Sequence, residues 1–474
     1  MTSMDRRQFL GGTALLGLTG LLAACSGGTA ARGGGDGGAT LTWWDHFGGL
    51  QNLHKEWSAK QGKAFGVTIE YTYNEPGNAT EALQLANQGN NLPDIFSPQV
   101  LGLPLPALVD AGWAHELPLS DATIARLPEG TFVEGMTMLD GKYYGLPAFT
   151  AGQWVGNAWF NKKIAEEVGF TAPKSYDQLL AALKAVADHG KYAPMTMALG
   201  NPGRIREQLD DLAQAGGFPG YQGLRYDTAE YEYHHDSYVN AIELYKEMSD
   251  KGWLMPGTNG FQIPDARGRW AAGTVAFQMD GPYSPGAVRS LNPGALEFMD
   301  IAGMPTPDGE DIVATRGARG SDWLVSGRSE HVEIATKVIE TLLDDEYQKG
   351  LAAGMDAPPI MLDVVETADV IEPYRRLVGE FKTHVFRAPM PQVRNVDVLK
   401  AQALMVPVQP DLGAIVQGYI GGDVTDLKAE LTKLSDSFSS ALDAAISGAT
   451  AAGAKVSRSD WEFADWKRGV DYPG

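Results

Sequence analysis

Short stretches in which apolar and polar residues alternate recur along the chain, and longer stretches with apolar residues at helical spacing follow them. Residues 39–43 alternate and precede the helical pattern of 50–61, and residues 67–72 precede that of 79–88. A period of two is typical of a strand, whereas a period near 3.6 is typical of an amphipathic helix. This β-α-β-α order predicts a parallel sheet covered by helices, in which ligands lie outside the carboxyl ends of the strands.

The same two patterns continue through the rest of the chain. Further strands are predicted over 94–96, 142–146, 156–160, 275–279 and 323–325, and further helices over 106–111, 175–187, 238–251, 266–273 and 330–343. Ser175 and Gln178 have the spacing of a capping box at the start of one of these helices. Residues after 366 are predicted to be mostly helical to about 447, and 460–471 form an amphipathic tail that can pack back on the body.

Composition narrows the class of protein. The chain has 474 residues, a formal net charge of −21 and 44% apolar residues. This length predicts two or three compact units, and the apolar content excludes a disordered chain. Phosphate backbones need clustered Lys and Arg, so the acidic balance argues against nucleic acid as a partner. The one cysteine excludes an intrachain disulfide and a cysteine-based zinc site.

The first 25 residues have the order of a bacterial export signal. Arg6 and Arg7 precede an apolar run over 9–24 that ends in small residues, which is the pattern of a signal peptide. The stretch 6–10 resembles the twin-arginine export motif, with departures at positions 5 and 11, and both this route and general secretion stay open. Residues 22–25, Leu-Ala-Ala-Cys, resemble a lipobox, which implies a signal peptide over 1–24 and a diacylated thiol on Cys25.

The segment 26–38 is rich in glycine and has no periodic apolar residue. We expect a flexible tether of about 20 Å. A lipid on Cys25 and this tether would hold an extracytoplasmic body, beginning near residue 39, at the cell membrane. Such a body contains no thiol for catalysis.

Four stretches in one order resemble a known family. They are Asn91-Leu92-Pro93-Asp94-Ile95-Phe96, then Gly145-Leu146-Pro147 through Trp159-Phe160-Asn161-Lys162 and on to 169–177, then Phe277-Gln278-Met279-Asp280-Gly281-Pro282-Tyr283, and finally 316–325. The chain is thereby similar, over roughly 39–450, to extracellular solute-binding proteins of ABC sugar importers, the maltose-binding type.

The resemblance implies the α/β fold of class II periplasmic-binding proteins, with a ligand cleft between two lobes joined by crossing strands. The expected N-lobe covers 39–151 plus 318–365, the C-lobe covers 152–317 plus 366–450, and 451–474 form a C-terminal tail. The implied function is to bind a sugar or oligosaccharide and deliver it to a membrane permease. We expect a monomer with no cofactor, no metal and no nucleic-acid partner.

Sugars present flat C–H faces and hydroxyl edges, so their sites need aromatic rings together with Asp, Asn, Gln or Arg. Candidate ligand contacts stand at predicted strand ends, at lobe crossings and at the positions that the resemblance indicates. They are Trp44, Asp45, Gln99, Trp154, Arg204, Tyr283, Asp322 and Trp323. Arg316 and Arg319 could instead pair a ligand carboxylate, which would indicate an acidic sugar. Asn395 and Asp397 stand where the family often has a Trp, which argues against a long maltodextrin.

Two other classes of protein remain open. A cell-surface glycoside hydrolase or lyase would need two carboxylates across the scissile bond, and the sequence offers no evident pair.

The sequence also contains no evident metal site. His234 and His235 are adjacent, so on a helix they point about 100° apart and cannot hold one metal. We therefore expect a binding protein without catalytic residues. The same fold could also bind a polyamine, an amino acid or a glycerol phosphodiester.

Overall fold

The computed structural model describes residues 38–473. Cys25, the expected signal peptide and the expected tether up to residue 37 lie outside the described residues. No helix in the part of the chain that the structure describes is long and apolar enough to cross a membrane.

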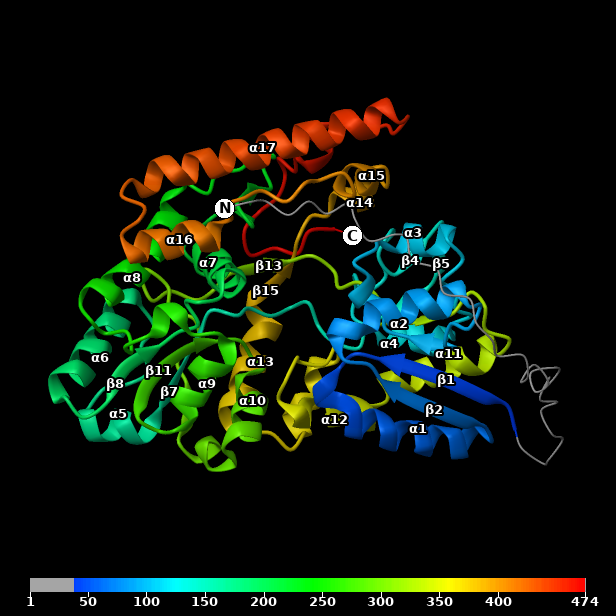
Figure 1. Cartoon of the computed structure of the whole chain (residues 1–474), viewed down its shortest axis with the longest axis horizontal. Helices are drawn as coiled ribbons and strands as arrows, with labels where there is room; N and C mark the ends of the chain where they lie inside the picture. Colours follow the sequence, from blue (N-terminus) through cyan, green and yellow to red (C-terminus); the bar gives the residue numbers. More distant parts are fainter. Residues whose placement is uncertain (1–37, 474) are drawn as a thin grey trace, which may run out of the picture. The chain divides into compact units, whose positions relative to one another are not determined.

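The N-terminal lobe is built on a five-stranded sheet with the order β2-β1-β3-β14-β6. Figure 1 labels two of its strands, β1 and β2, which lie side by side. Its strands are β1 (Thr40–Asp45), β2 (Thr68–Tyr73), β3 (Ile95–Phe96), β6 (Gly145–Leu146) and β14 (Trp323–Val325). β1 runs parallel to β2 and β3, whereas β14 runs antiparallel to β3 and β6. Its helices are α1 (Gln51–Phe65), α2 (Pro76–Gln88), α3 (Leu105–Asp110), α4 (Asp121–Arg126), α11 (Val332–Glu340) and α12 (Asp345–Gly354), and β4 (Met138–Leu139) with β5 (Lys142–Tyr143) forms a small hairpin.

The C-terminal lobe is built on a four-stranded sheet with the order β12-β7-β11-β8. Its strands are β7 (Asn157–Asn161), β8 (Ala193–Thr196), β11 (Val275–Asp280) and β12 (Met299–Ile301). Its helices are α5 (Lys162–Val168), α6 (Tyr176–His189), α7 (Pro202–Ala215), α8 (Asp236–Asp250), α9 (Ile263–Ala271), α10 (Ser284–Leu291) and α13 (Glu372–His384), with a hairpin of β9 (Gly220–Tyr221) and β10 (Leu224–Arg225).

The C-terminal part of the chain contains a strand that the helical pattern did not predict. β15 (Val385–Arg387) pairs in parallel with β13 (Ala314–Arg316). The helices α14 (Pro391–Arg394), α15 (Val398–Gln402), α16 (Leu412–Gly421) and α17 (Leu427–Ala451) follow it, and α17 packs on α15 and α16 (Figure 1). The prediction of a mostly helical segment is therefore confirmed, and β15 is the exception that it did not foresee.

The capping box predicted at the start of α6 forms only in part. Ser175 Oγ accepts a hydrogen bond from the Gln178 amide at 3.2 Å, as predicted. The Gln178 side chain, however, accepts from the amide of Lys174 at 2.8 Å and not from that of Ser175. The helix still begins where the sequence pattern placed it.

The chain passes between the two sheets at 147–156, at 302–322 and at 355–371, which we call the first, second and third crossing segments. Hydrogen bonds hold them side by side, because Ala148 N donates to Asp322 Oδ2 at 2.8 Å and Ile360 N donates to Ala148 O at 2.9 Å. The two lobes are therefore joined by adjacent segments.

A buried hydrogen-bond network fixes the carboxyl end of β1. His54 on α1 contacts Asp45 Oδ2 through Nδ1 at 2.5 Å and the Tyr347 hydroxyl through Nε2 at 2.7 Å. Asp45, His54 and Tyr347 are all buried. The network thus ties the last residue of β1 to α1 and α12.

We expect Tyr347→Phe to lower the free energy of unfolding by about 1–3 kcal/mol, because His54 then loses a buried partner. Urea unfolding followed by circular dichroism would measure the change. Tyr374→Phe is the matched control, since the Tyr374 hydroxyl makes only a 3.5 Å contact with the Asp356 carbonyl. Equal stabilities of the two variants would contradict the prediction.

Candidate functional site

Polar side chains gather at the edge of the N-terminal sheet where β1 and β3 end. His46 follows β1, Gln99 follows β3, and Asp322 precedes the antiparallel β14 at the same edge. Gln99 Nε2 donates to Asp322 Oδ1 at 2.6 Å, and Arg319 forms an ion pair with Asp322 at 2.6 Å. We call His46, Gln99, Arg319 and Asp322 the first cluster.

Asp322 is the centre of the first cluster and is fully buried. Its Oδ2 accepts from the backbone amides of Ala148 at 2.8 Å and Phe149 at 3.2 Å. A carboxylate occupied by these partners has no lone pair directed at a ligand. Asp322 therefore joins the first and second crossing segments and positions Gln99 and Arg319, which replaces the predicted direct contact.

His46 is a member of this cluster that the sequence did not single out. Its Nδ1 lies 2.7 Å from Ser97 Oγ, and burial lowers its pKa. At neutral pH the ring is uncharged, so it can exchange hydrogen bonds with hydroxyl groups without adding a charge to the site.

A second cluster lies at the carboxyl end of β11 in the C-terminal lobe. Tyr283 follows β11, and the guanidinium groups of Arg204 and Arg267 lie 4.9 and 5.2 Å from its ring centroid. Arg204 contacts the Tyr283 hydroxyl through Nη1, and Arg267 pairs with Asp280 at 2.6 Å. We call Arg204, Arg267, Asp280 and Tyr283 the second cluster. It brings together two of the predicted residues, Arg204 and Tyr283, with two that were not predicted.

Asp356 on the third crossing segment lies between elements of the two lobes. Its Oδ2 is 3.3 Å from the position that a Cβ would take on Gly49, in the loop after β1. The carbonyl of the preceding residue, Met355, accepts a hydrogen bond from the amide of Gly286 on α10 at 2.9 Å. The positive charge of Arg267 acts to lower the pKa of the Asp356 carboxyl group. No motif marks this residue in the sequence, because its place depends on how the crossing segments pack.

Two of the predicted aromatic contacts, Trp154 and Trp323, do not present an open ring face. Both are fully buried, Trp154 Nε1 donates to Asn157 at 2.6 Å, and the Trp323 ring packs edge-on against Trp43. Crossing geometry directs these two rings into the cores, so they do not line the ligand site as expected. Trp44 is half-buried and packs in part against the core that contains Phe96, and its contact with a ligand stays a prediction.

Asp45 was expected to contact the ligand, but it is buried and serves instead to hold the end of β1. Its carboxylate is occupied by His54 and by the amide of Phe47 at 3.0 Å, and only 2% of the residue is exposed. Among the eight predicted residues, Trp44, Gln99, Arg204 and Tyr283 thus keep accessible polar or aromatic surface.

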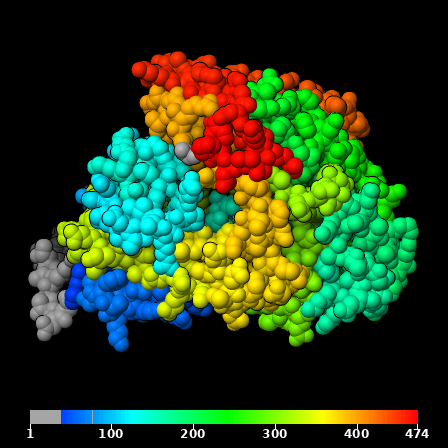
Figure 2. All heavy atoms as spheres, turned by 180° about the vertical axis from the view of Figure 1, so that it is seen from behind, coloured from blue at the N-terminus to red at the C-terminus, as the bar shows by residue number. Residues whose placement is uncertain are grey.

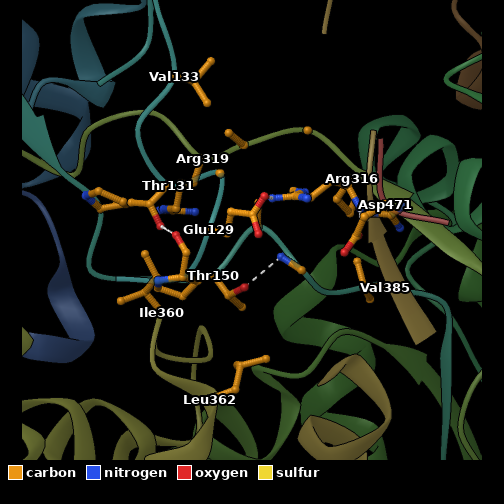
Figure 3. Close-up of a pocket in the computed structure, with 18 of the residues that line it drawn as sticks. Glu129, Thr131, Val133, Thr150, Arg316, Arg319, Ile360, Leu362, Val385 and Asp471 are labelled. Carbon is orange, nitrogen blue, oxygen red and sulfur yellow. Dashed lines mark hydrogen bonds and ion pairs between the residues drawn. The ribbon is translucent and has the colours of Figure 1, made fainter. Parts of the chain in front are cut away.

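A cavity of about 980 Å³ lies against the crossing segments, and the space-filling view shows it as a hollow seen from behind (Figure 2). None of the eight predicted ligand residues lines it. Its walls include the labelled residues of Figure 3, which are Glu129, Thr131, Val133, Thr150, Arg316, Arg319, Ile360, Leu362, Val385 and Asp471. The C-terminal tail forms one wall, since Asp471 accepts from the Arg387 amide at 2.7 Å and Tyr472 N donates to the Arg387 carbonyl at 3.0 Å.

The arginines considered for an acidic ligand are already paired. Arg316 forms an ion pair with Asp211 on α7, donates to the Gln153 carbonyl at 2.9 Å and lies over Tyr221. Arg319 pairs with Asp322. Both cations are therefore neutralised by protein carboxylates, which removes the reason to expect an acidic sugar.

Asp210, next to Asp211, makes no hydrogen bond with a cation of residues 38–473. It is buried, its Oδ1 accepts from the Tyr238 hydroxyl at 2.7 Å, and its Oδ2 has no partner among the described residues. Burial raises the pKa of Asp210 to about 7. No group of His, Cys, Asp and Glu side chains in the described residues is arranged to hold a metal ion.

Comparison with known proteins supports a binding function. Residues 56–374 match the family model of bacterial extracellular solute-binding proteins. No curated protein sequence matches the chain.

Among solved structures, the apo form of RafE from Streptococcus pneumoniae is similar with a TM-score of 0.63, 18% identity, and coverage of 87% of this chain and 100% of that one. The GacH receptor of Streptomyces glaucescens gives a TM-score of 0.60, 15% identity, and coverage of 85% and 98%. A solute-binding protein from Thermotoga lettingae gives a TM-score of 0.60 and 19% identity, with coverage of 85% of this chain and 100% of that one. These likenesses confirm the predicted two-lobed fold.

We expect Asp322→Ala to lower the free energy of unfolding by about 3–5 kcal/mol, because it leaves the Arg319 cation and two buried amides unpaired. Thermal and urea unfolding would measure the loss. Asp311→Ala removes an exposed carboxylate from the same crossing segment and is the control. A loss no larger than that of the control would show that Asp322 does not join the segments.

We expect the stability of the protein to depend on Asp210 between about pH 4 and pH 7. The folded pKa is raised above the unfolded value, so the contribution of this residue is fully present below about pH 4 and is lost as pH rises through about 7. Asp210→Asn keeps the Tyr238 contact and should be more stable than the parent at pH 8, by about 2–4 kcal/mol. Urea unfolding at pH 4 and pH 8 would test this, and an equal difference at the two pH values would contradict it.

Proposed function

Because the chain belongs to the bacterial extracellular solute-binding proteins, we propose that it captures a sugar or oligosaccharide between its two lobes and delivers it to the membrane permease of an ABC transporter. Similar structures support the choice of ligand class. RafE is described in complex with raffinose, GacH with acarbose, and the Thermotoga lettingae protein with α-D-tagatose.

One observation carries the proposal. The first and second clusters stand at the carboxyl ends of strands in two separate sheets, with the third crossing segment between them at Asp356. Open α/β sheets bind ligands at such ends. Closure of two lobes about crossing segments would bury most of a small ligand and release it again on opening.

We assign the ligand contacts to the accessible members of the two clusters. Gln99 and Arg204 would exchange hydrogen bonds with sugar hydroxyls, and the Tyr283 ring would pack on a C–H face. Asp322 would act indirectly by holding Gln99 and Arg319 in place. Trp154 and Trp323 would support the crossing segments from the cores.

The remaining parts of the proposal rest on the sequence. A lipid on Cys25 and the glycine-rich segment that follows would hold the body at the outer face of the cell membrane. The lobes would act as a monomer, with residues 39–151 plus 318–365 in one and 152–317 plus 366–450 in the other. The protein would perform no chemistry on the sugar that it binds.

We expect saturable quenching or enhancement of tryptophan fluorescence when the full chain is titrated with raffinose, maltotriose, xylotriose or cellotriose. Tyr283→Ala should weaken the binding of the responding sugar by about 1–2 kcal/mol, or roughly five- to thirtyfold, because the stacking ring is lost. Isothermal titration calorimetry would give the affinities. Tyr192→Ala, which removes a Tyr from the surface contact with Glu167, is the matched control.

Two results would contradict the proposal. If no sugar in the panel binds, the ligand class is wrong. If chromatography of the mixture shows that a sugar is cleaved, the protein is an enzyme of the carbohydrate-active class.

A further inference from the structure

Asp356 has an accessible carboxylate near the second cluster of the proposed sugar site. It is exposed and follows Met355 at the end of α12, where the chain turns into the third crossing segment. The loop after β1 approaches it from the N-terminal lobe at Gly49, and α10 contacts the preceding backbone from the C-terminal lobe. A ligand held by both lobes would therefore pass close to this carboxylate.

The cation nearest to Asp356 in charge interaction, Arg267, already forms an ion pair with another carboxylate. Arg267, on α9, pairs with Asp280 at 2.6 and 3.2 Å through two nitrogens. In the described part of the chain, no Lys, Arg or His forms an ion pair with Asp356. The Tyr374 hydroxyl reaches only its backbone carbonyl. The side chain thus keeps free acceptor positions.

The two clusters, together with Asp356 and with Glu207 beside Arg204, carry one excess negative charge. Their cations are Arg204, Arg267 and Arg319, which pair with Glu207 at 3.3 Å, Asp280 at 2.6 Å and Asp322 at 2.6 Å. Three cations and three paired carboxylates cancel, and Asp356 remains. A ligand with its own carboxylate would meet an unopposed like charge in a partly desolvated site, which is unfavourable.

We propose that Asp356 is a specificity-determining residue, which accepts hydrogen bonds from hydroxyl groups of an uncharged sugar and excludes acidic sugars. This inference rests on the proposed function and names its substrate class. Vicinal hydroxyls are paired donors, and a carboxylate offers two oxygens to receive them. Selectivity then comes from attraction of hydroxyls and from repulsion of carboxylates at the same position.

The charges around Asp356 predict that sugar binding depends on pH. Neighbouring protein atoms and Asp280 raise the pKa of Asp356, while Arg267 and the Ala357 amide oppose the rise. Hydroxyl donors stabilise the ionised form, so sugar binding should weaken as pH falls through the raised pKa of this residue. His46 contributes no competing charge at neutral pH, because burial lowers its pKa.

The test compares the full chain with Asp356→Asn, using the neutral sugar that binds best in the panel above and the same sugar carrying a terminal uronic acid. The parent should bind the neutral sugar about tenfold or more tightly than its uronic acid counterpart. Asp356→Asn should bind the neutral sugar about tenfold more weakly, since charge-assisted hydrogen bonds are lost. The variant should also discriminate less against the uronic acid and show a flatter pH dependence.

Asp369→Asn is the matched control, because Asp369 is an exposed carboxylate further along the same crossing segment. Thermal unfolding of each variant would show that both remain folded. Unchanged affinity and pH dependence in a folded Asp356→Asn variant would overturn this inference alone, as would tighter binding of the uronic acid by the parent. Failure of the parent to bind any sugar would overturn the proposed function, and this inference with it.

Discussion

The arrangement of the two lobes depends on one buried carboxylate. Asp322 accepts hydrogen bonds from two consecutive amides of the first crossing segment and holds Arg319 of the second. An extended segment between lobes leaves backbone amides without sheet partners, and buried amides must be satisfied. Because the same carboxylate receives Gln99 from the end of β3, the strand end that faces the ligand and the crossing segments share one anchor. Movement of one lobe relative to the other would therefore shift Gln99 and Arg319 at the site.

Charge pairing explains how the second crossing segment can contain two arginines close to the cores of the lobes. Arg316 forms an ion pair with Asp211, and Arg319 forms one with Asp322. Each arginine of the second crossing segment is therefore neutralised by a carboxylate of the protein. Burial of either partner alone would be costly, which makes each pair a fixed connection between neighbouring segments. Near the second cluster, Asp356 has a carboxylate that forms no ion pair within the described part of the chain, and a hydroxyl-rich ligand can bind to it.

The sequence predicted the fold better than the site. Alternation located β1, β2, β7 and β11 because each of these strands has a regular period or a buried run. β15 was missed because three residues next to a strong helical pattern carry no period of their own. Gln99, Arg204 and Tyr283 could be chosen because they follow strand ends. Trp154 and Trp323 were chosen for their chemistry, but the direction of a ring at a crossing depends on tertiary packing. Asp356 could not be found, since its neighbours come from Gly49 and α10, far away in the sequence.

The last residues of the chain have a consequence for biosynthesis. Asp471 and Tyr472 supply backbone and side-chain partners to Arg387 on β15, which in turn pairs with β13 beside the second crossing segment. Asp471 follows Arg387 by 84 positions in the sequence. The hydrogen bonding of this region is therefore complete only after residues 471 and 472 have been synthesised and can reach β15. Assembly of the region between the lobes thus follows the synthesis of β15 itself.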